Sequence, residues 1–289
     1  MKIIEIEQKF KLTYKNYISV LWNSYRRKNK IKVILRNTTL EPMIVSWAFA
    51  AGYPYLTHNE YISNVRLEGN DIRFTYKGKD INFIDGEFGD IGGVFGLEEY
   101  SFLEIEHEIV VDIGANIGDS PIYFALNNAK KVITLEPYPY SYNIASKNIM
   151  LNNLGDNITL LNAGYGGDGS VRINPDFKNL IDSDLKSFNE GVDIRTFSLK
   201  TLLNDYHIDK AVLKMDCEGC EYNLLKEDNN TLKKFKRIQI EYHYGYKRLK
   251  EKLEDTGFTV TYSKSVNYHN KDAKGQNMDI GYIYAKLGV

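Results

Sequence analysis

Short apolar runs recur through the second part of this 289-residue chain, and each is followed by a stretch long enough for a helix. Consecutive Val, Ile and Leu are typical of strands that a parallel sheet buries on both faces. The runs are IVVDI, KVITLE, NITLLN, AVLKMD and RIQIEY, and FTVTYS and DIGYIYAKL near the end are two further candidates. With crossover segments such as SPIYFALNNA between them, they predict an α/β fold with a mostly parallel, Rossmann-like sheet of seven strands.

The first hundred residues have a different pattern, so we expect an N-terminal α+β extension at 1–100 and a catalytic domain at 101–289. In this extension, DIRFTYKGKDINFI at 71–84 alternates around Lys77-Gly78 and predicts a hairpin. The extension and the irregular stretch 164–195 are the expected sources of an acceptor pocket.

A basic window opens the chain, because residues 8–40 contain nine Lys or Arg and no Asp or Glu. Tyr14, Ile18, Leu21, Trp22 and Tyr25 lie at helical spacing within it, which predicts an amphipathic helix with a basic opposite side. Such a helix either packs on its own domain or offers a surface to RNA, anionic lipid or a phosphorylated substrate.

Composition excludes an integral membrane protein, because no apolar run approaches the roughly 20 residues that span a bilayer. The N-terminal segment MKIIEIEQKF also lacks the pattern of a secretion signal. We therefore expect a cytoplasmic protein. A formal net charge of −1 selects no partner.

Cys217 and Cys220 are the two cysteines, in the sequence C-E-G-C. A zinc site needs about four ligands, and no second cysteine pair completes one. A thioredoxin-like pair is an alternative, since LKMDCEGCEYNLL reads as a strand running into a helix. The favoured interpretation is two small, partly buried thiols.

The segment VVDIGANIGDS at 110–120 is the candidate cofactor loop, because ligands of open α/β sheets bind at the first strand-to-helix turn. Gly114 and Gly118 permit a tight turn, and Asp112 ends the strand. Glu136 ends the next strand, where a carboxylate can accept hydrogen bonds from a ribose diol. Asn116 stands where a dinucleotide fingerprint needs a second glycine, which favours S-adenosyl-L-methionine over a dinucleotide.

Over residues 97–260 the sequence resembles the FkbM family of methyltransferases. The resemblance rests on VVDIGANIGDS, on KVITLEPYPYSYNIASKNIMLNN, and on LKMDCEGCEYNLL, which is similar to the family's K-x-D-x-E-G-x-E signature. The tract IQIEYHYGYKRL and the N-terminal region resemble archaeal members most. One departure is Cys220, where the family often has a small apolar residue.

The resemblance implies a class I methyltransferase fold, methylation of hydroxyl oxygens and a cofactor site. In that site Asp216 closes the pocket from the fourth strand and Glu136 holds the ribose. The remaining cofactor-binding residues that it implies are Asp112, Gly114, Ala115, Asn116, Gly118, Pro137, Asn162 and Ala163, the pair Asn162 and Ala163 beside the adenine.

Methyl transfer to an alcohol needs a base near the ends of the fourth and fifth strands. His243 is the first candidate, because an imidazole accepts a proton at physiological pH, and Glu218 is the rival. Glu221 and Glu241 lie at the same predicted rim. Asp216, Glu218, Glu241 and His243 could instead hold Mg²⁺, but their spacing defines no ligand set, so we predict no metal.

Three functions stay open at this stage. The first is an S-adenosylmethionine-dependent O-methyltransferase that acts on a hydroxyl of a sugar, glycan or related small molecule. The second is an RNA methyltransferase, such as one acting on tRNA, which the basic window would serve. The third is a cofactor-binding module without catalysis, whose N-terminal region contacts a partner protein.

Overall fold

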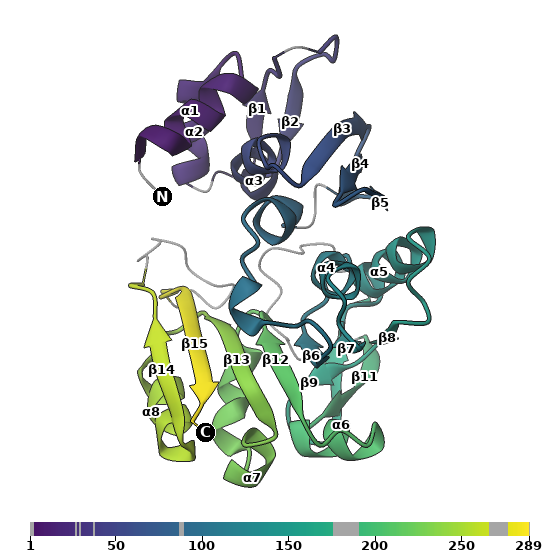
Figure 1. Cartoon of the computed structure of the whole chain (residues 1–289), viewed down its shortest axis with the longest axis vertical. Coiled ribbons are helices and arrows are strands. Elements are labelled where there is room, and N and C mark those ends of the chain that lie inside the picture. The colour runs from purple at the N-terminus through teal and green to yellow at the C-terminus, as the bar shows by residue number, and fades with distance from the viewer. Residues whose placement is uncertain are drawn as a thin grey trace. The chain divides into compact units, whose positions relative to one another are not determined.

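The computed structural model describes residues 3–26, 28, 30–36, 38–86, 90–175, 191–265 and 277–288 (Figure 1). Arg27 of the basic window and residues 176–190 of the stretch 164–195 lie outside these ranges. The chain divides into two compact units. One comprises Met1–Glu99 with Met150–Asn152, and the other comprises Tyr100–Ile149 with Asn153–Val289.

A seven-stranded sheet with the order β14-β15-β13-β12-β6-β7-β8 forms the centre of the larger unit (Figure 1). Its strands are β6 (Ile109–Ile113), β7 (Lys131–Leu135), β8 (Ile158–Leu161), β12 (Ala211–Met215), β13 (Phe235–Tyr242), β14 (Phe258–Tyr262) and β15 (Gly281–Leu287). Only β15 runs against its neighbours among these seven. The predicted mostly parallel, Rossmann-like sheet is confirmed, and all seven apolar runs supply its strands.

The crossovers of this unit are helical. They and the other elements are η3 (Ser101–Leu103), α4 (Asp119–Leu126), α5 (Pro139–Leu151), α6 (Leu199–Asp205), the 3₁₀ helix η4 (Cys220–Lys226), α7 (Asn229–Leu232) and α8 (Lys247–Thr256). A second sheet contains β9 (Gly164–Tyr165), β10 (Gly169–Ile173) and β11 (Val192–Phe197) in the order β10-β11-β9.

Strand order reverses between β6 and β12, because the chain moves from β6 outward through β7 to β8 and then returns to β12 on the other side of β6. Ligands of open α/β sheets bind at the carboxyl ends of the strands at such a point. The register there pairs Lys214 of β12 with Asp112 of β6. A charged pair therefore forms inside the sheet, near the carboxyl ends of β6 and β12.

The smaller unit combines helices with antiparallel strands. It contains α1 (Ile3–Thr13), α2 (Tyr17–Tyr25), β1 (Ile31–Val33), β2 (Met43–Val45), α3 (Trp47–Thr57), β3 (Ile62–Glu68), β4 (Asp71–Tyr76), β5 (Lys79–Phe83) and the π-helical turn η2 (Gly92–Gly96). Strands β4 and β5 pair antiparallel around Lys77-Gly78, as predicted. Within the described ranges, no helix combines the length and apolar character that a bilayer-spanning segment needs.

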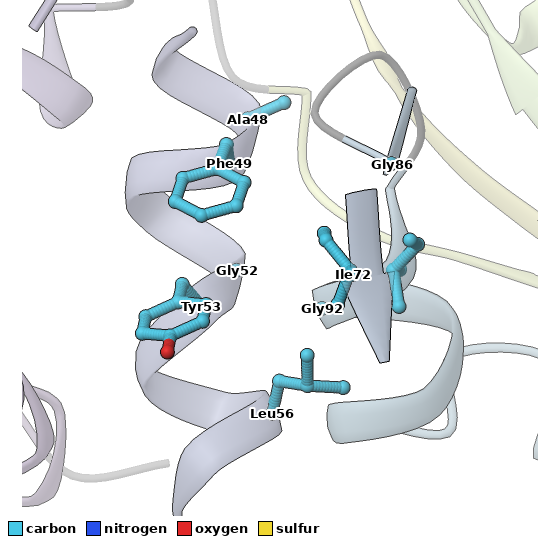
Figure 2. Close-up of a pocket in the computed structure, with 9 residues that line it drawn as sticks. Ala48, Phe49, Gly52, Tyr53, Leu56, Ile72, Gly86 and Gly92 are labelled. Atoms are coloured by element: carbon cyan, nitrogen blue, oxygen red, sulfur yellow. The ribbon is translucent and has the colours of Figure 1, made fainter. Parts of the chain in front are cut away.

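Helix α3 and η2 contact each other through Gly52 and Gly92. A Cβ on Gly92 would lie 2.2 Å from the α-carbon of Gly52, so a side chain there would push the two segments apart. Figure 2 shows the small pocket beside this contact, with Phe49 and Tyr53 along one side of α3 and Ile72 opposite them. Burial raises the pKa of the Tyr53 hydroxyl to about 12.

Helix α2 exposes most of the apolar stripe that its sequence spacing defines. Ile18, Trp22 and Tyr25 are exposed, and Val20 and Ser24 form the buried side of the helix. Tyr14 precedes the helix and is fully buried. The sequence periodicity identified the apolar stripe, but the helix packs on its own unit through the opposite face, which contains Val20 and Ser24.

Candidate functional site

The turn from β6 to α4 passes against the end of β12. Gly114 has a φ of +92°, and a Cβ on it would lie 1.9 Å from the backbone oxygen of Asp216, so only glycine fits. Asn116 adopts a φ of +47°, a left-handed conformation that asparagine tolerates. Gly118 then precedes α4, and the buried Ala115 donates its N–H to the carbonyl of Leu135 at 3.0 Å. The predicted cofactor loop therefore has a tightly determined backbone.

A buried ion pair supports this turn from below. Lys214 Nζ lies 3.1 Å from Asp112 Oδ1 and donates to the carbonyl of Gly114 at 2.6 Å. Ser120 and Thr134 donate their hydroxyls to Asp112 Oδ2 at 3.0 and 2.7 Å. Asp112 is fully buried, so its carboxylate holds the turn in place from inside the sheet.

Lys214 is a site residue to which the sequence analysis gave no role. Burial opposes its charge, but the carboxylates of Asp112 and Asp216 outweigh that effect and raise the pKa of the ammonium group. The available signal was a lysine inside the apolar run AVLKM, because a buried strand accommodates a charge only with a partner.

Glu136 ends β7 beside the turn. Its two carboxylate oxygens accept the backbone N–H groups of Asn116 and Tyr138, each at 2.9 Å. Burial raises the pKa of this carboxyl to about 7. Asn162 donates its side-chain amide to the carbonyls of Glu136 and Pro137 at 2.9 and 3.0 Å, which fixes the end of the strand.

These residues fit S-adenosylmethionine. Each Glu136 oxygen accepts one backbone hydrogen bond and can accept a second, which matches two adjacent ribose hydroxyls. The acidic residues Asp216, Glu218 and Glu241 follow or end neighbouring strands at the same edge of the sheet and suit a positively charged sulfonium. Ala163 is buried in the apolar core next to Asn162.

Glu221, His243 and Glu218 form a chain of contacts at the ends of β12 and β13. His243 Nε2 lies 3.1 Å from Glu218 Oε2, and Nδ1 lies 3.1 Å from Glu221 Oε1. The backbone N–H of His243 donates to the same Glu221 oxygen at 2.9 Å. Glu221 and His243 are buried, whereas the Glu218 side chain is 22% exposed. Glu218 is thus the solvent-facing end of the chain.

The two carboxylates in this contact chain favour the protonated, imidazolium form of His243. Burial opposes the positive charge of His243, but the two neighbouring carboxylates outweigh it and raise the pKa of the ring well above its usual value. Burial also raises the pKa of Glu218 above that of an ordinary glutamate, although His243 counteracts this shift. In the imidazolium form, both ring nitrogens of His243 donate hydrogen bonds to carboxylates.

Glu241 lies next to the contact chain of Glu221, His243 and Glu218. One ligand atom from each of Asp216, Glu241 and His243 lies within 4.8 Å of the other two, a spacing that could accommodate a divalent cation. Both nitrogens of His243 already face carboxylates at 3.1 Å, so we assign no metal to these residues.

A disulfide joins Cys217 and Cys220, whose α-carbons are 5.5 Å apart. The expectation of two free thiols is therefore wrong. The strand β12 and the helical turn η4 bring the two cysteines close together, and C-E-G-C spacing permits a bond within one turn. The bond encloses Glu218 and Gly219, so it lies within the candidate catalytic site.

Comparison with protein families agrees with this geometry. The family model of the methyltransferase FkbM domain matches residues 112–269 of the chain. The chain is also 26% identical, over 144 residues, to the uncharacterized protein 158B of Sulfolobus islandicus rod-shaped virus 1. That match covers 50% of this chain and 66% of the viral protein.

Solved structures with similar folds include methyltransferases. TYW2 of M. jannaschii in complex with AdoMet has 20% identity and a TM-score of 0.42, over 78% of this chain and 89% of that chain. An O-methyltransferase from Bacillus cereus in complex with SAH has 16% identity and a TM-score of 0.37, over 66% and 79%. Precorrin-6y C5,15-methyltransferase from Geobacter metallireducens has 15% identity and a TM-score of 0.40, over 66% and 87%. At these values the similarities assign no acceptor.

The ion pair beneath the turn generates a stability prediction. Lys214→Met leaves the Asp112 carboxylate buried without its cation and should lower the free energy of unfolding by about 3–5 kcal/mol. Asp112→Asn together with Lys214→Met should recover most of that loss. The control Lys236→Met, which removes an exposed ion pair with Glu108, should cost at most about 1 kcal/mol. Guanidinium denaturation measures all three, and a loss for Lys214→Met no larger than that control would contradict the prediction.

The raised pKa of Glu136 generates a pH prediction. Affinity for S-adenosylmethionine should increase as the pH rises through about 7, because the ionised carboxylate accepts stronger hydrogen bonds from the ribose. Without cofactor the sign is opposite: this buried carboxyl stabilises the fold below its ordinary pKa of 4.5, and that contribution is lost as the pH rises through about 7.

Glu136→Gln keeps the size of the side chain and removes its ionisation. Calorimetry at pH 6 and pH 8 should show that this variant binds the cofactor about 10–100-fold more weakly at pH 8 and with little pH dependence. Equal affinity of both proteins at both pH values would show that Glu136 does not contact the ribose.

Proposed function

Because this chain belongs to the FkbM methyltransferase family, we propose that it methylates a hydroxyl oxygen of a sugar, a glycan or a related small molecule. It is an S-adenosylmethionine-dependent methyltransferase. The observation that supports a hydroxyl acceptor is the contact chain Glu221, His243 and Glu218 at the carboxyl ends of β12 and β13. A hydroxyl needs a base during methylation, and this group of three side chains supplies one.

Glu218 is the proposed base. Its carboxylate is the partly exposed end of the contact chain, and partial burial raises its pKa above that of an ordinary glutamate. A base with a raised pKa accepts a proton more readily at neutral pH. His243, the first candidate from the sequence, is buried with both nitrogens engaged, so we propose that it orients Glu218 instead.

Glu221 is a positioning residue in this proposal. Its Oε1 accepts the backbone N–H and faces Nδ1 of His243, and its Oε2 accepts the N–H of Gly219 at 2.8 Å. One buried carboxylate therefore fixes both the imidazole and the loop that carries Glu218. Glu241 and Asp216 complete an acidic wall next to His243.

When bound, the cofactor supplies an electrophilic methyl group on a positively charged sulfur. The chain's own residues would orient the cofactor and the acceptor hydroxyl. Glu136 would accept hydrogen bonds from the ribose hydroxyls of the cofactor. The turn at Gly114 would leave room for the amino acid end of the cofactor, and Asp216 would close the pocket from β12. Glu218 would remove the proton of the acceptor hydroxyl as the oxygen attacks.

RNA is a second candidate acceptor, which the exposed aromatics of α2 favour. Trp22 and Tyr25 are 59% and 75% exposed, and their ring centroids lie 6.4 Å apart in a stacked arrangement. The guanidinium carbon of Arg26 lies 5.9 Å from the centre of the Trp22 ring. Aromatic and basic side chains together can stack on unpaired bases and contact phosphates.

The proposed base leads to a kinetic prediction. Glu218→Gln should lower kcat for methyl transfer by about 10²–10⁴-fold, because the acceptor loses its base. Cofactor affinity should stay within about twofold of that of the unaltered protein, since the side chain acts on the acceptor. Transfer of labelled methyl groups to glycan, lipid, RNA and small-molecule cell fractions identifies the substrate for this assay.

Two comparisons make this result specific. Glu218→Asp retains a carboxylate and should retain part of the activity, and Glu251→Gln, an exposed acid on α8, should retain all of it. Unchanged kcat in Glu218→Gln would exclude this residue as the base. Cofactor binding with no labelled fraction at all would favour a binding module without catalysis.

The RNA alternative predicts salt-dependent binding. Arg26→Gln with Lys28→Gln should reduce the slope of log affinity against log salt concentration by about two, because two phosphate contacts are lost. The matched pair Arg73→Gln with Lys79→Gln, elsewhere on the same unit, should change it little. Filter binding with tRNA measures the slopes, and absence of retention at low salt would remove RNA from consideration.

A further inference from the structure

We propose that the Cys217–Cys220 pair is a redox site that controls methyl transfer by positioning Glu218, so that the disulfide form is the active form. This inference rests on the proposed function, because it takes Glu218 as the base. It adds a reaction of the protein with dithiols, and it assigns a role to a bond that the methylation chemistry does not itself need.

The disulfide constrains the loop on which Glu218 lies. Cys217 and Cys220 close a ring around Glu218 and Gly219, whose φ angles are +53° and +110°. A left-handed conformation is uncommon for residues other than glycine. In this conformation Glu218 Oε2 lies 3.1 Å from His243 Nε2. The covalent ring therefore holds the carboxylate in the position that the proposed reaction requires.

Noncovalent contacts also reach this loop. The Gly219 N–H donates to Glu221 Oε2 at 2.8 Å, the Asn223 side-chain amide donates to the carbonyl of Cys220 at 3.1 Å, and Glu218 faces His243 at 3.1 Å. Without the disulfide, the left-handed turn depends on noncovalent contacts of this kind. We expect the reduced loop to relax toward ordinary backbone angles and to carry Glu218 away from His243.

The rest of the contact chain also has partners outside the disulfide loop. Glu221 is fully buried and faces His243 through both the backbone N–H and the ring Nδ1. Glu136 belongs to the end of β7, where backbone groups of the cofactor turn and of Tyr138 hold it. Reduction should therefore alter the position of Glu218 and spare the binding of the cofactor.

The chemistry of the switch is ordinary thiol–disulfide exchange. Cys217 is half-buried and Cys220 is buried, so Cys217 is the accessible sulfur. The thiolate of a small dithiol attacks Cys217, the S–S bond breaks, and Cys220 leaves as a thiolate that takes a proton. The second thiol of the reductant then releases Cys217 as a thiol, and the reductant becomes a disulfide.

A regulatory role for the disulfide applies where the surroundings are reducing. In reducing compartments, protein disulfides are usually transient and have catalytic or sensing roles. In such a compartment the chain would cycle between the two forms. The bond would then report the thiol state of the cell at the site of methyl transfer.

The test compares the full chain in its disulfide form with the same protein reduced by dithiothreitol. Alkylation and mass spectrometry confirm zero and two free thiols. NMR follows the ring proton of His243 as a function of pH, with His243→Gln to assign the signal. Steady-state kinetics and calorimetry give kcat and the affinity for S-adenosylmethionine.

Reduction should lower kcat by at least tenfold and change cofactor affinity by less than threefold. It should also lower the titration midpoint of His243, because Glu218 no longer faces the ring; Glu221, Asp216 and Glu241 remain near it in both forms. Cys217→Ser with Cys220→Ser should behave as the reduced protein and ignore dithiothreitol. In Glu218→Gln, reduction should have no further effect on kcat.

Equal kcat and equal His243 titration in the two forms would overturn the inference, and so would a pair that never forms the disulfide. If the double serine variant fails to fold, the reversible reduction of the unaltered chain still decides the question. If neither form transfers methyl groups, the proposed function fails, and the His243 titration alone tests the coupling between the disulfide and Glu218.

Discussion

The buried pair of Lys214 and Asp112 is the interaction on which the site depends. Neighbouring strands in register place the two side chains together inside the sheet, and each charge makes the other tolerable there. Asp112 also accepts hydrogen bonds from the hydroxyls of Ser120 and Thr134, and Lys214 donates one to the carbonyl of Gly114. One ion pair thus connects β6, β7, β12 and α4 beneath the candidate cofactor turn.

Strand β12 connects this support to the chemistry. Side chains two residues apart point to the same face of a strand, and Asp216 follows Lys214 by two positions at the strand end. Immediately after it, the disulfide-closed turn presents Glu218 to His243 from the neighbouring strand β13. The cofactor turn and the proposed base are therefore positioned by one strand and the short segment that follows it, and a disturbance of β12 should affect both.

The sequence predicted the elements that apolar patterning determines and missed the contacts that depend on neighbours. Val, Ile and Leu runs located all seven strands, and Glu136 was identified because it ends the strand after the glycine turn. The role of Lys214 required the register between β6 and β12. The contacts of His243 with Glu218 and Glu221 required β13 to lie beside β12.

One expectation failed and one question stayed open, for related reasons. The sequence favoured separate thiols for Cys217 and Cys220, because spacing alone does not say whether the turn between them brings two sulfurs together. Periodicity in α2 defined a stripe containing Ile18 and Trp22, but it could not say which side of the helix packs on the unit. Both outcomes depend on backbone geometry that a residue pattern does not encode.

A crystal structure of this chain with S-adenosylhomocysteine tests the central claim most directly. The account predicts both ribose hydroxyls within hydrogen-bond distance of Glu136, and the sulfur on the side of the pocket where Glu218 and His243 lie. A ribose held elsewhere, or a sulfur facing away from Glu218, would contradict the assignment of the cofactor site and of the base.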